Sequence, residues 1–339
     1  MTLLRHRYLR RLVTFSAVWI LLILLLTTLP LWMLGAAAIS ARVPGKWRPL
    51  RLLWFFTVYL ALEAVGIVAA GALWVATGFG SRFGRMDVRE VHYRLLGSLL
   101  GILVRTGRRA FRLELDVSAP PLPDEEPEVE RGPRPLVVIS RHAGPGDSFL
   151  LVHELISVYG RRPRIVLKDT LQWDPMIDLL LNRLPTRFIS PNPSSAGVAE
   201  SIGVLAADMG AQDALVIFPE GGNYTEHRRE RAIARLEAAG ETALAQRART
   251  IRNLMAPRPG GVFAAINAAP AADVVFVAHQ GLEELSTPAD LWRGLPMDSD
   301  VRVQFWTVAA EDVPEDRAEQ IDWLYDWWER VDAWVEDPR

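Results

Sequence analysis

The chain has 339 residues, a formal net charge of −2 and no cysteine. The lack of cysteine excludes disulfides, thiolate metal sites and a cysteine nucleophile, and the charge gives no overall basic signal for nucleic acid. The length allows one large domain or two ordinary ones.

Two long apolar runs open the chain. Residues 12–41 hold no charged side chain, and as one helix they would be about 45 Å long, so we expect Pro30 to kink or split the run. Residues 52–79 form the second run, whose only charge, Glu63, is functional, protonated or hydrogen-bonded to the neighbouring helix. We assign residues 1–80 to a membrane-associated helical hairpin, either as two spans or as a hairpin lying partly in one leaflet.

Basic residues around these runs indicate an orientation. Four arginines precede the first run and four follow the second, whereas the connecting loop at residues 42–51 carries three arginines and one lysine. Two spans place both ends on one side of the membrane, and the larger number of basic residues favours the cytoplasm for that side. We therefore predict a cell-membrane protein whose remaining chain lies on the cytoplasmic face.

A helix and a linker follow the hairpin. Residues 91–112 combine many leucines with arginine as the only charged residue type, which predicts an amphipathic helix lying on a membrane surface or against the next domain. Residues 119–135 are rich in proline, glutamate and aspartate, which is typical of an exposed linker. These features indicate a connecting helix at 81–118, a linker at 119–135 and a domain at 136–339.

Strands and helices alternate from residue 136 onward. Apolar runs predict strands at 136–139, 165–167, 187–189, 214–218, 274–278 and 301–307. Helices are expected at 149–158, 175–184, 194–209, 226–249, 262–268 and 315–334. The last helix has an aromatic face that we expect to pack on the domain, with a membrane-facing edge as the alternative. This alternation predicts an α/β domain with a mostly parallel sheet flanked by helices.

The first of these strands leads into a candidate catalytic pair. His142 follows the strand, and Asp147 comes after a turn rich in glycine and proline, where Asp147 or Ser148 is expected to cap the next helix. A carboxylate bonded to one imidazole nitrogen fixes the tautomer, so the other nitrogen can take a proton from a hydroxyl. The same spacing also fits a surface loop in which Asp147 only caps the helix.

A second motif, FPEGG at residues 218–222, follows another buried strand. The carboxyl ends of parallel strands share one edge of the sheet, so we expect this motif and His142 to meet there. Glu220 can bond substrate hydroxyls, and Gly221 and Gly222 can let the backbone approach a ligand closely. The alternative is a tight turn that simply needs glycine.

Together these motifs resemble the glycerolipid acyltransferases, which make phosphatidic acid from lysophosphatidic acid. That family carries NHxxxxD, then a basic residue at a strand end, then FPEGT, and the likeness here covers roughly residues 136–278. The resemblance implies a general base, a carboxylate that orients it, and a Glu-Gly block with basic residues that hold the acceptor. The implied catalytic residues are His142 and Asp147, and the implied substrate-binding residues are Glu220, Gly221, Gly222, Lys168, Arg187 and Arg258.

The resemblance also implies the reaction, a membrane-bound O-acyl transfer in phospholipid synthesis. The acyl chain would pass from acyl-CoA or acyl carrier protein to the hydroxyl of a lysophospholipid, with 1-acylglycerol-3-phosphate as the expected acceptor. No metal and no further cofactor are implied, and the expected partners are the acyl donor, the acceptor and the lipid bilayer. Two alternatives stay open: a different lysolipid or glycolipid acceptor, and an inactive membrane-anchored lipid-binding homologue.

Overall fold

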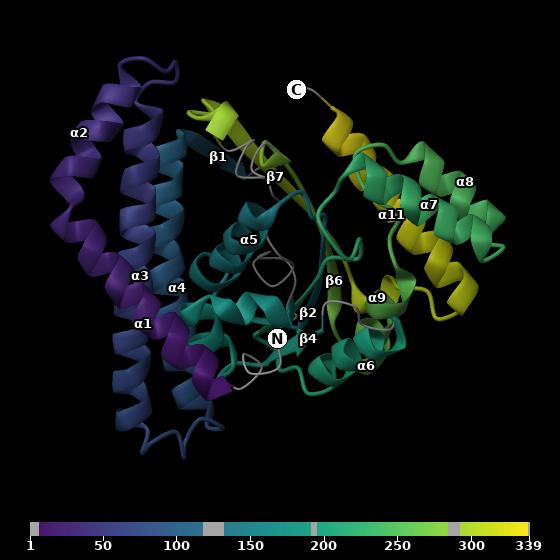
Figure 1. Ribbon diagram of the computed structural model, residues 1–339. Coiled ribbons are helices and arrows are strands. Elements are labelled where there is room, and N and C mark those ends of the chain that lie inside the picture. Colours follow the sequence, from purple (N-terminus) through teal and green to yellow (C-terminus); the bar gives the residue numbers. More distant parts are fainter. Residues whose placement is uncertain (1–6, 118–131, 191–194, 284–291, 338–339) are drawn as a thin grey trace.

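The structure is a computed structural model that describes residues 7–117, 132–190, 195–283 and 292–337. Within these residues, seven strands form one sheet in the order β1-β7-β6-β2-β5-β3-β4 (Figure 1). β6 and β7 are antiparallel and the other neighbouring pairs are parallel, so the predicted mostly parallel sheet is confirmed. The strands are β1 (Leu113–Val117), β2 (Leu136–Ser140), β3 (Arg162–Lys168), β4 (Thr186–Ile189), β5 (Asp213–Ile217), β6 (Asp273–Gln280) and β7 (Ser299–Val308).

Helices cover both faces of this sheet (Figure 1). One face carries α6 (Ser195–Ala206), α9 (Pro259–Ala268) and α11 (Arg317–Glu336), and the other carries α5 (Pro145–Ser157) with α4 (Met86–Phe111) behind it. The other elements are α1 (Arg7–Thr27), α2 (Leu29–Ser40), α3 (Arg48–Ala76), α7 (Glu226–Ala238), α8 (Thr242–Thr250), and the short turns η2 (Asp169–Trp173), η3 (Ile177–Leu181) and η5 (Ala310–Asp312).

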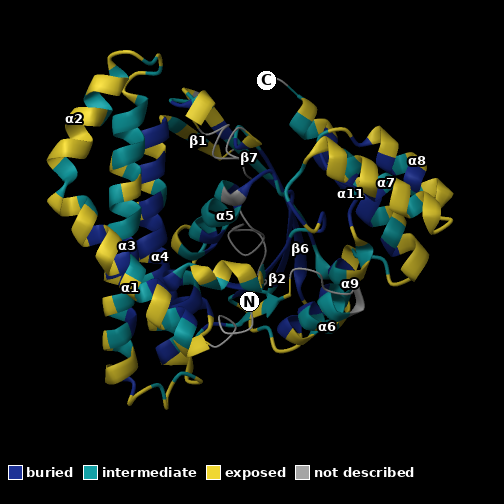
Figure 2. Cartoon of the chain, viewed as in Figure 1, coloured by how far each residue is buried: buried dark blue, intermediate teal, exposed yellow. Residues whose placement is uncertain are grey.

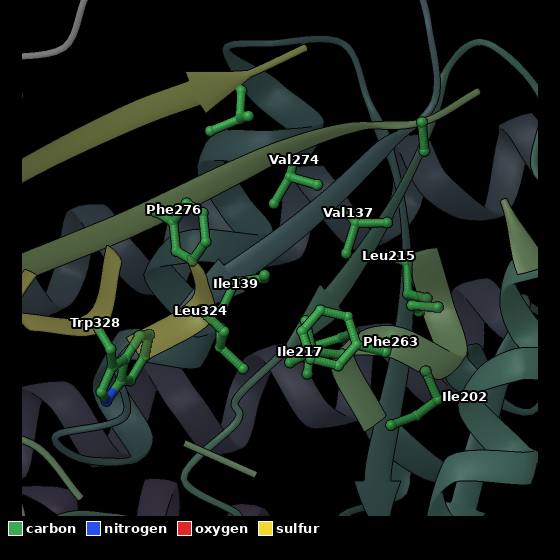
Figure 3. Close-up of a cluster of buried hydrophobic side chains, with 14 of the residues drawn as sticks. Val137, Ile139, Ile202, Leu215, Ile217, Phe263, Val274, Phe276, Leu324 and Trp328 are labelled. Atoms are coloured by element: carbon green, nitrogen blue, oxygen red, sulfur yellow. The ribbon is translucent and has the colours of Figure 1, made fainter. Parts of the chain in front are cut away.

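The core lies where the central strands meet α6, α9 and α11. Val137 and Ile139 of β2, Phe276 of β6 and Trp328 of α11 are buried together there (Figure 3). β2 and β5 are buried along their whole length, as expected for apolar, β-branched strands covered on both faces. Ile139 pairs with Ile217 of β5 and with Phe276, so the carboxyl ends of these three strands come level at one edge of the sheet.

Three apolar helices form the N-terminal hairpin, in which α1 and α2 pack along α3. α1 ends at Thr27 and α2 begins with Pro30 in its first turn, so the expected split at this proline is confirmed. Among the described residues, α1 and α3 are the two helices long and apolar enough to cross a membrane. Much of the outward face of α1 and α2 is exposed (Figure 2), including Leu31 and Leu34.

The hairpin also contacts the α/β domain along its length. The contacts at its base, middle and turn are Arg10 Nη2 to Asp178 Oδ1 (2.8 Å), Met176 N to Glu63 Oε2 (3.0 Å) and Arg48 Nε to Leu295 O (2.7 Å). Glu63 is therefore hydrogen-bonded, but to a backbone N–H of the domain rather than to a neighbouring helix. The turn between α2 and α3 lies against the domain, as does the base of the hairpin.

Two segments differ from expectation, the end of the connecting helix and the helix expected at 226–249. The segment at 113–117, expected inside the connecting helix, forms the edge strand β1, because α4 ends at Phe111 and its C-cap residue Arg112 has a left-handed φ of 57°. The single helix expected at 226–249 is two helices, α7 and α8, separated by Gly240 with a φ of 79°. α4 packs against the domain through buried residues such as Leu96 and Leu100. Most of the expected linker at 119–135 lies outside the described residues.

Candidate active site

β2 carries His142 to the carboxyl edge of the sheet. Arg141 N donates to Val277 O (3.2 Å), so the hydrogen-bond ladder with β6 continues past the last residue of β2. On the other side, Tyr224 N, from the loop after β5, donates to His142 O (2.9 Å). The backbone at Arg141 and His142 is therefore held by β6 on one side and by the loop after β5 on the other.

α5 begins immediately after this loop. Its first residue is Pro145 and its N-cap is Gly144, so Asp147 is the third residue of the helix. The expectation that Asp147 or Ser148 is the N-cap residue is wrong, because proline suits the first helical position and starts the helix earlier. The Asp147 carboxylate still serves the helix start, since Oδ2 accepts from Ala143 N (2.7 Å) and Gly144 N (3.0 Å).

His142 and Asp147 contact each other directly. Nδ1 of His142 lies 3.0 Å from Oδ1 and 3.1 Å from Oδ2 of Asp147. Because an ionised carboxylate only accepts hydrogen bonds, Nδ1 of the neutral ring carries the proton and Nε2 is unprotonated. Nε2 has no partner among the described residues, the side chain is 17% exposed, and the ring packs on Phe218 with centroids 4.5 Å apart. This geometry can accept a proton from a hydroxyl group.

Asp147 is ionised although it is buried. Burial alone raises the pKa of its carboxyl, but hydrogen bonds from His142 and His279 lower the pKa well below the usual range. The hydroxyl of Ser148 donates a further hydrogen bond to Oδ1 (3.0 Å). An ionised partner stabilises the imidazolium that forms when His142 takes up a proton.

Glu220 links the two motifs through the backbone. Its Oε1 accepts from His142 N (2.7 Å) and its Oε2 accepts from Met255 N (2.9 Å), and the residue is only 3% exposed. Burial raises the pKa of Glu220 to about 7, against the opposing effect of the two backbone donors. The observed contacts make Glu220 a brace for the His142 loop, and its predicted contact with the acceptor stays a prediction.

Gly221 and Gly222 lie against two arginine side chains. Gly221 has a φ of 72°, and a Cβ there would lie 2.7 Å from Cζ of Arg258, while a Cβ at Gly222 would lie 3.3 Å from Nη1 of Arg228. The Arg258 guanidinium is exposed and has no hydrogen bond or ion pair to any described residue. The glycines thus allow a free guanidinium group to lie directly on the backbone that follows β5.

Lys168 and Arg187 are not joined to His142 by any contact within the described chain. Lys168 ends β3 and Arg187 lies in β4, and β5 separates these strands from β2. Arg187 pairs with Val166 of β3, whose side chain packs on the face of the sheet that α6 and α9 cover. Phe218, which contacts the ring of His142, packs on the opposite face. The substrate-binding roles of Lys168 and Arg187 stay predictions.

Two residues beside the pair were missed as site residues from the sequence. His279 is 4% exposed, and its Nε2 lies 3.5 Å from Asp147 Oδ2. It directly follows the strand expected at 274–278, so the strand-end rule that identified His142 also applies to it. Arg141 is buried, and its guanidinium donates to Glu283 Oε1 (2.6 Å) and to His279 O.

Two apolar cavities adjoin the pair. The smaller, of about 60 Å³, lies between α5 and the sheet, with Asp147 and His279 in its wall. The larger, of about 280 Å³, lies between α5, α4 and α3, and its lining includes Gly146 and Phe149 beside the His142 loop. Its volume is close to the lower end of typical ligand sites, about 300 Å³.

In the described part of the chain, no group of three or more His, Asp or Glu is arranged to hold a metal ion. A family model described as Acyltransferase matches residues 124–279. This range contains His142, Asp147, Glu220 and Arg258, and it ends at His279. No curated protein and no solved structure matches the chain.

Proposed function

We propose that this protein is a membrane-bound acyltransferase of phospholipid synthesis, which the match of residues 124–279 to the Acyltransferase family model supports. It moves an acyl chain from acyl-CoA or acyl carrier protein to the hydroxyl of a lysophospholipid, with 1-acylglycerol-3-phosphate as the proposed acceptor. The observation that carries the proposal is the His142 ring, which Asp147 holds through Nδ1 while Nε2 has no partner among the described residues.

The chemistry needs no acyl-enzyme. Nε2 of His142 takes the proton of the acceptor hydroxyl as its oxygen attacks the thioester carbonyl, which gives a tetrahedral intermediate. The intermediate collapses as the carbon–sulfur bond breaks, and the imidazolium returns its proton to the departing thiolate. Asp147 stabilises the imidazolium between these two proton transfers and fixes the orientation of the ring.

The start of α5 is suited to stabilise the oxyanion of that intermediate. Ala143 N and Gly144 N already donate to Asp147, and Pro145 has no N–H. Asp147 N donates to Gly144 O (3.4 Å), so the backbone N–H of Gly146 is the proposed donor, at the positive end of the helix dipole.

The larger cavity is the proposed place for an acyl chain. Its wall brings together Gly146 and Phe149 beside the His142 loop, Leu103 of α4, and Phe55 and Tyr59 of α3. An apolar space that begins beside the reacting groups and leads toward the hairpin can take a chain without exposing it to water. The hairpin then contributes to the substrate site as well as to membrane binding.

The polar end of the acceptor is expected at the FPEGG edge. Arg258 lies on Gly221 with its guanidinium free of described partners, and Arg228 lies on Gly222. Guanidinium groups bind phosphate in a bidentate manner, so this pair favours an acceptor that carries a phosphate. Lys168 and Arg187 remain proposed contributors at the neighbouring strand ends.

We place the hairpin in one leaflet on the cytoplasmic side of the cell membrane. Its base, middle and turn all contact the domain, at Asp178, Met176 and Leu295. A hairpin that crossed a bilayer of about 30 Å would carry its turn away from a domain that remains outside. The exposed apolar face of α1 and α2 then lies among the acyl chains.

The test is acyl transfer by the full-length protein, purified in detergent and returned to lipid vesicles. Labelled acyl-CoA and acyl carrier protein are each offered with a panel of phosphate-bearing and uncharged lysolipids. We expect transfer to 1-acylglycerol-3-phosphate, and transfer about 10²–10⁴-fold slower by a folded His142→Ala variant. Transfer only to another lysolipid or glycolipid would correct the acceptor, and binding without transfer to any acceptor would make the protein a lipid-binding homologue.

A further inference from the structure

Asp147 lies between two imidazole rings. Nδ1 of His142 is 3.0 Å from its Oδ1, and Nε2 of His279 is 3.5 Å from its Oδ2. The other side-chain and backbone donors to the carboxylate, Ala143, Gly144 and Ser148, come from the same short loop and helix start. His279 comes from β6, so it connects the carboxylate to a separate strand of the sheet.

The surroundings of His279 define its tautomer. Nε2 faces two acceptors, Asp147 Oδ2 and, at 3.3 Å, Arg141 O, so Nε2 carries the proton. Nδ1 is buried without a hydrogen-bond partner, and the ring lines the smaller apolar cavity. With this tautomer the ring donates to Arg141 O at 3.3 Å, and the same N–H also faces Asp147 Oδ2 at 3.5 Å, a longer contact than the 3.0 Å between Nδ1 of His142 and Oδ1.

Asp147 is the polar side chain that lies next to Nε2 of His279, and the other charged and titratable groups nearby are located as follows. Glu154 of α5 and Tyr159, just after this helix, line the same cavity, and β7 contributes the apolar Val303 and Phe305. Arg141 bonds the backbone oxygen of His279 and forms an ion pair with Glu283 at 2.6 Å, so these two charges largely neutralise each other.

We propose that His279 is a positioning residue for the acyl transfer: its imidazole shares the Nε2 proton between Arg141 O and Asp147 Oδ2, and so holds the carboxylate toward Nδ1 of His142. The inference rests on the proposed function for its kinetic consequence, but the contact itself can be tested without activity. A donor on Oδ2 restricts rotation of the carboxylate, which keeps the Nε2 atom of His142 aimed at the acceptor hydroxyl.

The kinetic test compares His279→Leu, which removes the donor, with His279→Gln, whose amide nitrogen can replace Nε2. We expect His279→Leu to lower kcat about tenfold with the acceptor KM unchanged, and His279→Gln to recover most of that loss. In an Asp147→Asn background, His279→Leu should cause no further loss, because the residue acts through that carboxylate. His92→Leu is the matched control, since His92 is also buried but lies on α4.

A kcat for His279→Leu within about twofold of wild type, or losses that add in the double variant, would overturn the proposal. The second measurement is the ¹⁵N spectrum of the histidine side chains, with signals assigned from the His142→Ala and His279→Gln variants. We expect Nδ1–H for His142, Nε2–H for His279, and displacement of both signals in Asp147→Asn. An Nδ1–H tautomer for His279, or signals indifferent to Asp147→Asn, would refute the contact even if the wild-type protein transferred no acyl group.

Discussion

The hairpin and the α/β domain arrange polar and apolar side chains in opposite ways. In the domain, apolar residues such as Ile139 and Trp328 are buried in the core. In the hairpin, Leu31 and Leu34 are each 70% exposed, whereas Glu63 is 1% exposed and faces the domain. Each arrangement suits its own surroundings, because apolar surface is stabilised away from water and buried polar groups need hydrogen-bond partners. The exposed apolar face of the hairpin therefore suits contact with lipid acyl chains.

The sharpest test of this contrast is the accessibility of the hairpin turn. The protein has no cysteine, so Arg42→Cys in the turn and Glu230→Cys on α7 each provide a single reactive thiol. In sealed membrane vesicles, a membrane-impermeant maleimide should label both or protect both, because we propose that the turn and the domain lie on the same side. Labelling of one thiol and full protection of the other would show that the hairpin spans the bilayer.

The next largest effect concerns the catalytic pair. His142→Ala should lower kcat by about 10²–10⁴-fold, as expected for loss of a general base, with circular dichroism unchanged. Asp147→Asn should also be severe, and the double variant scarcely worse than His142→Ala, because the two residues act as one unit. Chelators should leave the rate unchanged. The control is His227→Ala, because His227 is an exposed histidine on α7. Near-normal turnover by a folded His142→Ala protein would contradict the proposed mechanism.

A smaller effect is expected at the basic edge. If the acceptor carries a phosphate, Arg258→Ala should raise the acceptor KM about ten- to a hundredfold with kcat little changed, as for loss of a charge-assisted contact. Lys168→Ala should act in the same direction if Lys168 contributes. Arg85→Ala, at an exposed ion pair with Asp87, provides the comparison. Steady-state kinetics with unchanged KM for both site variants would exclude them from the phosphate site.

The smallest expected effect is the pH dependence of stability set by Glu220. Its pKa in the folded protein is about 7, above its usual value, so the unfolded chain releases this proton first as the pH rises. Folding stability should therefore fall between about pH 4.5 and 7, by at most about 3 kcal/mol. Glu220→Gln cannot ionise, so its thermal melting temperature should decline less than that of wild type between pH 5 and 7.5. Parallel melting profiles would contradict the buried, raised-pKa carboxyl.

Sequence reasoning worked where one segment carries its own signal. The apolar runs of β2 and β5 could form only buried strands, and the split before α2 follows from Pro30. β1 was missed because Leu113–Val117 is a short, largely exposed edge strand that depends on β7 for its pairing. The break between α7 and α8 at Gly240 was missed because glycine is tolerated inside a helical pattern.

The site was predictable as far as neighbouring residues define it. The pairing of His142 with Asp147 follows from a strand end and the helix start beside it. The contacts of Glu220 could not be predicted in this way. Its partners are backbone N–H groups 78 and 35 residues away, and every residue type except proline supplies such a group. His279 reaches Asp147 only because the sheet places β6 beside β2, which is a property of the topology.

The indole N–H of Trp328 in α11 donates to Met255 O (2.9 Å), and Asp332 in the same helix accepts from Asn253 N (2.7 Å). Met255 N in turn donates to Oε2 of Glu220, and Oε1 of Glu220 accepts from His142 N. During synthesis the hairpin leaves the ribosome long before α11 does, so a nascent chain can reach the membrane before its site exists. A chain clipped before Trp328 would keep the hairpin but lose part of the support of His142, so the proposed acyl transfer would depend on synthesis of α11.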